Sequence, residues 1–501
     1  MRRAALAIGT ATLLAGPTAL AFFSGGYFAV PRLVAAIVAW LLVLGAVLLA
    51  PDPLPRGRAA WVAIGGLTLM TLWTAASVAW APLRGPALED VERLVLYLGA
   101  LLAAFAILRH PRALRMAEPA LAGGTLVVIA YGLAGRLLPG LVTLSASTKA
   151  GGRLEQPLTY WNAEGLLAAI GVVLCARIAG DPGRPRGLRI AAAGAVAPLA
   201  AGVYLSFSRG AIAAAFAGLL VLVAQAPGWA QLRAVALAAV TGVLGAVAAA
   251  PFGGVASLSG SLTSREHAGA VVLVLELALV AAAALVTARL LALERRGRLG
   301  DDPVPGARRL PALAAVVVGL GAVALVAGGL GEKGAHRAAQ TGAHASRLTS
   351  VDSNRYDYWR AGVKAFAAHP LDGLGASGFR TYWLRHRTIK EGVQEVHSIE
   401  LEMAAELGVL GLLALALFVG GLAAAGRTAL RRAPPLAVGA CAVGVTWLLH
   451  ASIDWDWQMP AVTLPVLVLA GGLLALAEGP DAATPATRAA APGADREPVR
   501  A

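Results

Sequence analysis

The sequence predicts an all-α protein: a polytopic bundle of about 12–14 transmembrane helices with one large, partly helical loop that faces outward. Of the 501 residues, 58% are hydrophobic and only 14% are charged, which is too little polar surface for a soluble chain of this size. The apolar residues form continuous runs, whereas the strands of a membrane barrel would alternate. Because about 20 apolar residues in a helix cross the hydrocarbon core, each run can be counted as one span.

Fourteen runs are predicted as spans, and the run at 211–225 is short enough that it could merge with a neighbour. The first span is expected to be kept, although its basic start and the small residues Ala19-Leu20-Ala21 resemble a cleavable secretory signal. The predicted spans are residues 5–23, 32–50, 59–80, 91–108, 117–138, 163–179, 189–205, 211–225, 234–250, 268–290, 310–329, 405–425, 436–451 and 461–477.

The positions of lysine and arginine in the short loops predict the orientation, because cytoplasmic loops are enriched in both residues. With the N-terminus inside, nearly every alternate loop is rich in arginine, and the weakest has only Arg233. Both termini then lie inside and the large loop faces outward. The arginine-rich loops contain Arg56 and Arg58; Arg109, Arg112 and Arg115; Arg184, Arg186 and Arg189; Arg295, Arg296, Arg298, Arg308 and Arg309; and Arg427, Arg431 and Arg432.

This pattern divides the chain into four parts. Residues 1–329 are predicted to hold transmembrane helices 1–11, residues 330–404 the large periplasmic or extracellular loop, residues 405–477 helices 12–14, and residues 478–501 a disordered cytoplasmic tail. The net charge of +14 follows largely from this topology and from attraction to anionic lipid headgroups at the inner leaflet, so no nucleic-acid partner is expected.

Missing motifs narrow the chemistry further. The sequence has no glycine-rich phosphate loop, no His-Glu-x-x-His, no nucleophile elbow and no cysteine and histidine cluster. Nucleotide hydrolases, proteases, lipases and zinc enzymes are therefore disfavoured, and we expect neither a metal nor a cofactor. Cys175 and Cys441 lie inside apolar runs and are predicted to be packing residues.

The stretch between Gly331 and Glu402 interrupts the apolar pattern and is the first place to look for chemistry. It holds five of the eight histidines, ten lysines or arginines and eight acidic residues. From Asn354 onward it is predicted to be helical, with Arg355 and Trp359 on one stripe and Arg360 about 100° round from Trp359. His397 is predicted about two helical turns above the next span. For each of these residues the alternative is a solvated surface position.

Two further outer segments carry polar residues at the ends of spans. Between Arg153 and Asn162, Tyr160 and Trp161 fit an interfacial aromatic belt, and Asn162 could cap the following helix. Arg153 gains nothing from the topology rule, so it is a candidate binding residue. The other segment, Ser208-Arg209-Gly210, links two apolar runs so tightly that Arg209 is expected near membrane depth, facing headgroups or a polar cavity.

The last outer segment runs from His450 to Pro460. Trp455 and Trp457 suit the membrane interface, whereas Asp454 and His450 could orient neighbouring groups or pair with an arginine. Arginines on an outer face, without metal or nucleotide motifs, suit a phosphorylated substrate already in the outer leaflet, because the guanidinium binds phosphate bidentately. A nearby histidine can accept a proton from a hydroxyl. Together these groups predict group transfer from a lipid pyrophosphate to a hydroxyl.

At this level of detail the chain resembles the O-antigen ligase and polymerase superfamily of bacterial envelope enzymes. The likeness runs over most of the chain, in an order that fits the predicted topology. Many members have asparagine where this chain has Ser398. The resemblance is carried by Leu72-Trp73, Ser77 to Pro82, Arg153 to Asn162, Ser208 to Gly210, Arg355, Trp359, His369 to Gly375, His397, and Glu406 to Gly408.

The resemblance implies a metal-independent, inverting glycosyltransferase of the cytoplasmic (inner) membrane whose active site faces the periplasm or cell exterior. The implied donor is a glycan on undecaprenyl pyrophosphate, and the acceptor is a hydroxyl of lipid A core in lipopolysaccharide, a growing glycan or a protein. His397 would be the general base, and a lateral apolar groove would hold the polyprenyl chain. The donor pyrophosphate would be bound by Arg209 and Arg355, with Arg153 and Arg360 as second-rank candidates, supported by Ser208, Asn162, Trp359 and Asp454.

Two alternatives stay open. The superfamily motifs do not separate a ligase from a polymerase of lipid-linked repeat units. A flippase or transporter of lipid-linked oligosaccharides would also have about this many spans, but it would be expected to place paired charges near the bilayer centre. Here most spans have apolar middles, and the polar groups gather at one face.

Overall fold

The chain folds as a polytopic helical bundle. The computed structural model describes residues 2–49, 53–300, 304, 342–344, 348 and 353–479, which form helices and no strand. Twelve helices in this part of the chain are long and apolar enough to cross a membrane, and the apolar helix α8 is shorter. They are α1 (Arg2–Ala21), α2 (Ala29–Leu49), α3 (Arg58–Ser77), α4 (Arg84–Leu108), α5 (Pro111–Leu137), α6 (Trp161–Gly180), α7 (Arg186–Leu205), α8 (Arg209–Gln225), α9 (Trp229–Ala249), α11 (Leu262–Arg295), α15 (Ile399–Arg432), α16 (Pro434–Ala451) and α17 (Pro460–Glu478).

Each of these helices coincides with one predicted span, including α8, which is separate from its neighbours. The predicted span at residues 310–329 lies outside the described residues. Shorter elements complete the fold: η1 (Ser24–Gly26), α10 (Gly253–Ala256), α13 (Arg355–Ala368), α14 (Phe379–His386) and η4 (Asp456–Gln458). The all-helical prediction is therefore confirmed for the part of the chain that is described.

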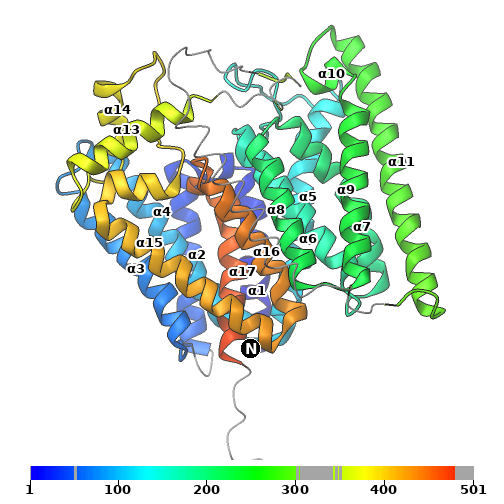
Figure 1. The fold of residues 1–501 in the computed structure, drawn as a ribbon, viewed down its shortest axis with the longest axis horizontal. Helices are drawn as coiled ribbons and strands as arrows, with labels where there is room; N and C mark the ends of the chain where they lie inside the picture. The colour runs from blue at the N-terminus through cyan, green and yellow to red at the C-terminus, as the bar shows by residue number, and fades with distance from the viewer. Residues whose placement is uncertain are drawn as a thin grey trace, which may run out of the picture.

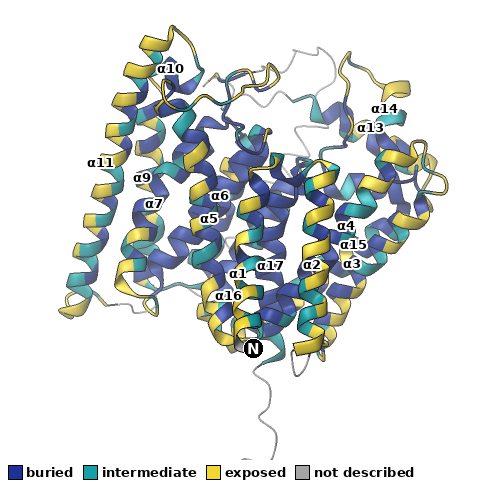
Figure 2. Cartoon of the chain, turned by 180° about the vertical axis from the view of Figure 1, so that it is seen from behind, coloured by how far each residue is buried: buried dark blue, intermediate teal, exposed yellow. Residues whose placement is uncertain are grey.

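Figure 1 shows α2, α3, α4 and α15 on one side of the bundle, α5 to α9 and α11 on the other, and α1, α16 and α17 between them. Within the described residues α6 is wholly buried and α17 nearly so, whereas α2, α9 and α11 expose most of their apolar surface. This difference is visible in Figure 2. Lipid and protein interior are both apolar, so the surface helices need no polar outer face.

The crossing of α3 and α15 is especially close. Both helices contribute a glycine: a Cβ on Gly66 would overlap the backbone at Phe418, and one on Gly421 would overlap the backbone at Ala63. Small residues let membrane helices approach backbone to backbone, where dispersion replaces the hydrophobic effect as the attraction. This contact ties the N-terminal part of the bundle to the helix that follows the large loop.

Helix α15 is interrupted at Gly408, whose backbone (φ 65°, ψ −155°) is accessible to glycine and strained for other residues. The loop after α13 occupies the break. The amide of Leu374 donates to the carbonyl of Ala405 (3.0 Å), and the amide of Val409 donates to the carbonyl of Pro370 (2.9 Å). A Cβ on residue 408 would also overlap the carbonyl of Leu371. The glycine-rich loop and the Glu406-Leu-Gly408 motif are thus two halves of one joint.

Glu406 completes this joint with its side chain, which accepts from the amides of Ser377 (2.9 Å) and Phe379 (3.1 Å). The end of α3 docks on the same loop, because the amide of Ala376 donates to Ser77 Oγ at 3.0 Å. Trp73 Nε1 donates to the carbonyl of Leu407 at 2.9 Å. The sequence motifs in α3, in the loop and in α15 therefore have one shared structural task, which is to seat the loop on the bundle.

The described residues 353–398 form a small helical layer, here called the cap, over α4 and α15 (Figure 1). It has its own apolar centre, in which Tyr358 and Phe379 each lie against Trp383. Trp383 Nε1 donates to the carbonyl of Glu391 (2.7 Å), and Glu391 in turn accepts from the Tyr358 hydroxyl (2.7 Å). The cap is thus a packed unit and not an open loop.

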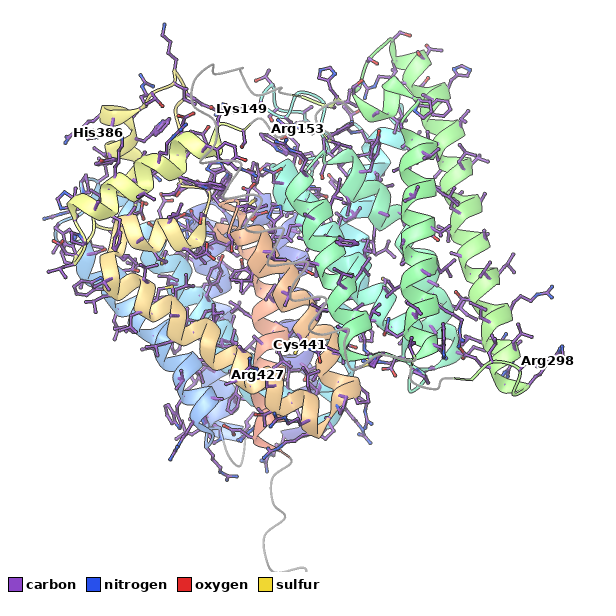
Figure 3. The ribbon with its side chains drawn as sticks, in the orientation of Figure 1. Lys149, Arg153, Arg298, His386, Arg427 and Cys441 are labelled. Carbon is purple, nitrogen blue, oxygen red and sulfur yellow. The ribbon has the colours of Figure 1, made fainter. Side chains whose placement is uncertain are left out.

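The cap and the arginine-rich loops lie at opposite ends of the bundle. In Figure 3, Lys149, Arg153 and His386 lie at the end that carries the cap, and Arg298 and Arg427 lie at the opposite end. Val304 donates its amide to Pro227 at the arginine-rich end (2.8 Å), and Ala343 donates its amide to Gly151 at the cap end (2.9 Å). Val304 and Ala343 therefore lie at opposite ends of the bundle.

We predict that His386→Cys is labelled by a membrane-impermeant thiol reagent on intact cells, whereas Arg298→Cys is labelled only after the membrane is opened. Both side chains are exposed in the structure, so accessibility should report the side of the membrane. The unaltered chain is the control, because Cys175 is buried and Cys441 lies inside α16. The opposite labelling pattern would overturn the assigned orientation.

Candidate active site

Asp454 is the centre of the polar cluster at the cap end of the bundle. It lies in the short link between α16 and α17, and it is fully buried. Its carboxylate accepts from the Tyr160 hydroxyl (2.8 Å), from Asn162 Nδ2 (2.7 Å) and from the amide of Trp455 (2.8 Å). The guanidinium of Arg355 pairs with it from the cap side. Donors from two distant segments, residues 160–162 and Arg355, thus converge on one carboxylate.

Arg355 is the first residue of α13 and brings the cap to this cluster. Burial alone would lower the pKa of its guanidinium, but Asp454 together with smaller contributions from Tyr160, Asp456 and Tyr358 more than offsets burial and raises it. Burial would likewise raise the pKa of Asp454, yet the charge of Arg355, with the hydrogen bond from Tyr160, helps to hold it below its usual range. The pair is therefore fully ionised. About a quarter of the Arg355 side chain, 24%, remains exposed, and a guanidinium has five N–H donors, so the side chain can also bind an anion.

His397 lies next to this ion pair, just before α15. Its Nδ1 is 3.0 Å from the carbonyl oxygen of Glu395. A carbonyl only accepts, so Nδ1 carries the proton in a neutral ring and Nε2 presents a lone pair. Among the described residues Nε2 has no hydrogen-bond partner. The imidazole is thus held in the tautomer that a general base requires.

The backbone and ring of His397 are fixed from the cap. Its φ of 62° lies in the left-handed region, which costs energy for a residue with a Cβ and persists only when neighbours enforce it. Trp359 Nε1 donates to the His397 carbonyl at 3.1 Å, and the Tyr358 ring lies 5.1 Å from the imidazole. Ser398 follows as the N-cap of α15 and accepts from the Leu401 amide. Asparagine caps helices equally well, which accounts for either residue at this position.

The environment of His397 also sets its protonation. Burial lowers the pKa of the imidazole below its ordinary value of 6.5, Arg355 lowers it further, and Asp454 partly opposes both. Net lowering means that the ring is neutral at neutral pH. A neutral ring with a free Nε2 can accept a proton.

A second chain of hydrogen bonds leads to the start of α8. Ser208 caps this helix by accepting from the Ala211 amide (3.2 Å), and its Oγ is 3.5 Å from His450 Nε2. His450 Nδ1 is 3.1 Å from an Asp456 oxygen. Arg209 is the first residue of α8 and follows Ser208 directly. A Cβ on Gly210 would lie 3.0 Å from His450 Nε2, so the N-terminus of α8, the positive end of the helix dipole, lies beside the cluster.

The two second-rank arginines are engaged elsewhere. Arg153 is buried, its guanidinium lies 3.6 Å from the centre of the Trp161 ring, and it donates to the carbonyls of Lys149 and Ala150. Arg360 is half exposed and pairs with Asp357 at 3.0 Å. In the contacts of the described chain, neither arginine reaches Asp454. Arg153 shapes the loop before α6, and Arg360 lies on the outer surface of the cap.

Two local expectations are wrong. Tyr160 is not part of an aromatic belt, because its ring is buried and its hydroxyl donates to Asp454. Asn162 does not cap α6, since the helix begins at Trp161 and the Asn162 amide donates to Asp454 and to the Tyr160 hydroxyl. His397 lies just before α15, which starts at Ile399 and runs into the predicted span at residues 405–425.

Several site residues escaped the sequence reasoning. Tyr358 and Gln458 carried no signal, and Tyr160 and Trp455 looked like ordinary interfacial aromatics. Gln458 Nε2 bridges the buried carboxylates of Glu395 (2.9 Å) and Glu402 (2.5 Å) beneath the cluster. The only sequence signal for these residues was that Trp455 and Gln458 lie close to Asp454 along the chain. Among the described residues no group of three or more histidines, cysteines and acids is arranged to hold a metal ion.

Fold and site together define a multi-pass membrane protein with a buried cluster of charged and hydrogen-bonded side chains at one face. Residues 255–416 match the protein family described as O-antigen ligase, a stretch that covers less than half of the chain and contains Arg355 and His397. The match supports the O-antigen ligase-like superfamily that the sequence resembles, and with it, in general, glycosyl transfer of the O-antigen ligase or polymerase kind. Such proteins act in general on a lipid-linked glycan and a polysaccharide acceptor. A search of curated proteins gave no significant match.

We predict that glycan transfer is lost on the acidic side with an apparent pKa below 6.5. The reaction needs neutral His397, so activity is complete above the lowered pKa and falls as pH decreases through it. Asp454→Asn should move this limb to still lower pH, because it removes the anion that favours the imidazolium. The measurement is kcat/KM against pH. Asp372→Asn, on the exposed surface of the cap, should leave the limb in place. A limb above 6.5 would contradict the assignment of His397.

Proposed function

We propose that this protein transfers a glycan from an undecaprenyl-pyrophosphate carrier to an acceptor hydroxyl at the outer side of the cytoplasmic membrane, with inversion and without a metal. One observation carries the proposal: Arg355, held by the buried Asp454, stands beside His397, whose Nδ1 is tied to a carbonyl. In this proposal the anion-binding group and the base, in the correct tautomer, lie together at the face that carries the cap.

The proposed reaction is a single displacement. His397 Nε2 takes the proton of the acceptor hydroxyl as its oxygen attacks the anomeric carbon of the donor sugar. The bond from that carbon to the pyrophosphate oxygen breaks on the opposite face, and undecaprenyl pyrophosphate leaves with both bonding electrons. Arg355 and Arg209, with the amides at the start of α8, stabilise the negative charge that develops on the leaving group. Attack opposite to the leaving group inverts the anomeric centre.

The remaining candidate residues support these groups. Asn162 and Tyr160 hold Asp454, which orients Arg355. Burial and Asp454 both raise the pKa of Tyr160, so its hydroxyl stays protonated as a donor. Trp359 holds the backbone of His397, and Ser208 caps α8 ahead of Arg209. Each of them acts through another residue, so we regard them as positioning residues.

An apolar cavity of about 350 Å³ between α1, α2, α4 and α17 fits the lipid part of the donor. Its lining is almost entirely aliphatic and includes Phe23 and Val30 at the cap end of the bundle. The next residues lead to the polar cluster: Tyr27 lies 5.5 Å from Trp455, and Trp455 lies 4.5 Å from Tyr160 (ring centres). A polyprenyl chain in this cavity would therefore have its pyrophosphate end near Asp454 and Arg355.

We predict that Arg355→Lys lowers kcat for transfer by about 10²-fold or more, because lysine keeps the charge but loses the planar fork that serves Asp454 and the pyrophosphate. His397→Ala should lower it by about 10²–10⁴-fold, the range for loss of a general base. Transfer is measured with purified protein in lipid nanodiscs, lipid-linked donor and labelled acceptor. Matched controls are Arg360→Lys on the same helix and His386→Ala on the exposed end of α14. Full activity in Arg355→Lys, Arg209→Ala and His397→Ala would disprove the proposed site.

The same assay separates the alternatives. A polymerase would lengthen the lipid-linked glycan when donor is supplied alone, whereas a ligase needs a separate acceptor. A flippase would move lipid-linked glycan across the bilayer without forming a new glycosidic bond. We favour glycan transfer over transport because the described polar groups converge on one face and not at mid-membrane.

For the apolar cavity between α1, α2, α4 and α17, we predict that Gly16→Leu raises KM for the undecaprenyl-linked donor about tenfold and changes kcat little. Gly16 lines the cavity, and a Cβ there meets nothing within 4 Å, so leucine would fill the space of one or two methylenes of the tail, at about 0.8 kcal/mol each. A donor with a ten-carbon prenyl tail should be much less affected. Gly45→Leu is the control, because Gly45 is equally open but lies outside the cavity. Equal effects of the two substitutions would exclude the cavity as the tail site.

A further inference from the structure

A second and larger cleft lies between α1 and α5, at the end of the bundle opposite the cap. Its volume is about 1280 Å³, and its walls are mostly small or aliphatic side chains. On α1, Ala7, Ala11 and Ala15 line it and are exposed to the surroundings. Figure 2 shows α1 on the surface of the bundle beside α5. Nothing in the proposed transfer reaction uses this cleft.

The shape of the cleft follows from where the two helices touch. At Gly124 a Cβ would overlap Thr18 Oγ1, so α5 and α1 are in close contact there. From this contact the cleft extends back toward the start of both helices, as far as Leu6 on α1 and Pro111 on α5. The distance from Leu6 to Thr18 along a helix is roughly 18 Å, at about 1.5 Å per residue. The hydrocarbon thickness of one leaflet is roughly 15 Å, so the cleft is as deep as one leaflet.

The mouth of the cleft is basic. His110, Arg112 and Arg115 line it where α5 begins, and none of the described lining residues is acidic. Neither Arg112 nor Arg115 forms an ion pair with any carboxylate in the described part of the chain. The nearby acid Glu118 is taken by Arg184, which also donates to the carbonyl of Arg115 (2.6 Å) and so fixes its backbone. The mouth therefore presents two cations above an apolar slot.

We propose that this cleft binds an anionic phospholipid of the inner leaflet, with an acyl chain along α1 and α5 and its phosphate at Arg112 and Arg115. The occupant is a lipid because the cleft combines a one-leaflet apolar depth with uncompensated positive charge at the headgroup level. Basic pockets between transmembrane helices at the cytoplasmic side recognise such headgroups. A helix from another protein would need no cations there. The lipid would bind far from the Asp454 cluster, so the proposal stands independently of the transfer reaction.

The test is native mass spectrometry of the full chain purified from membranes, followed by titration with phosphatidylglycerol or phosphatidylcholine. We expect one anionic phospholipid retained per chain and a preference for phosphatidylglycerol. Arg112→Gln with Arg115→Gln should weaken binding of phosphatidylglycerol by about fivefold for each arginine removed, on the scale at which one juxtamembrane basic residue attracts anionic lipid. Ala11→Phe should block the slot and lower binding of both lipids.

The matched control is Arg298→Gln with Arg427→Gln, which removes two exposed arginines at the same end of the bundle but away from the cleft (Figure 3). This variant should bind lipid as the unaltered chain does. Equal loss in the control, or equal affinity for the two lipids, would overturn the proposal. A photoreactive residue at Ala7 gives a second readout: crosslinks to lipid support the proposal, and crosslinks to a protein helix refute it.

Discussion

The ion pair between Arg355 and Asp454 is the contact on which the candidate site depends. Asp454 lies in a link that is buried among helix ends, where an unpaired carboxylate would cost several kcal/mol. Arg355 offsets that cost only while α13 sits over the bundle, so the cap and the membrane helices are coupled through one carboxylate. Tyr160 and Asn162 satisfy the remaining lone pairs, and they tie the start of α6 to the same point.

The cap is also held to the membrane helices by the loop after α13. The loop after α13 enters the break in α15 at Gly408, and Glu406 accepts from two amides of that loop. These contacts fix the orientation of α15 relative to the cap. They therefore also fix the positions of His397 and Ser398, the two residues that directly precede α15. The sequence motifs of the large loop and the start of α15 divide into two groups. Arg355 and His397 lie beside the Asp454 cluster, whereas the glycines and Glu406 fix the loop to α15.

The helices were predictable because the bilayer sets both their length and their apolar character. Every span predicted within the described residues has a matching helix, and the outer arginines, His397 and Asp454 stood out as polar residues beside apolar runs. Packing was not predictable. Lipid and protein interior select the same side chains, so nothing in the composition of α6 marks it as central or α11 as peripheral.

Convergence was equally hidden. Tyr160 and Asp454 are separated by 294 positions, and an aromatic residue at a span end has the same composition whether it faces headgroups or a buried carboxylate. An asparagine beside a predicted helix start is expected to cap that helix. Only the fold shows that the Asn162 amide donates to Asp454 instead. The roles of Arg209, Arg355 and His397 in transfer stay predictions, because position and protonation indicate chemistry without demonstrating turnover.

The close crossing of α3 and α15 has a consequence for traffic through the bilayer. At Gly66 and Gly421 each glycine contacts the backbone of the other helix. No acyl or prenyl chain can therefore pass between α3 and α15, and this flank of the bundle is closed to lipid. The apolar cavity bounded by α1, α2, α4 and α17 opens on a different flank, so it is the side from which a membrane-borne molecule has a route to the cap. Within the described residues the flanks of the bundle therefore differ, and a neighbouring protein that delivers such a molecule to the cap would approach from the side of α1, α2, α4 and α17.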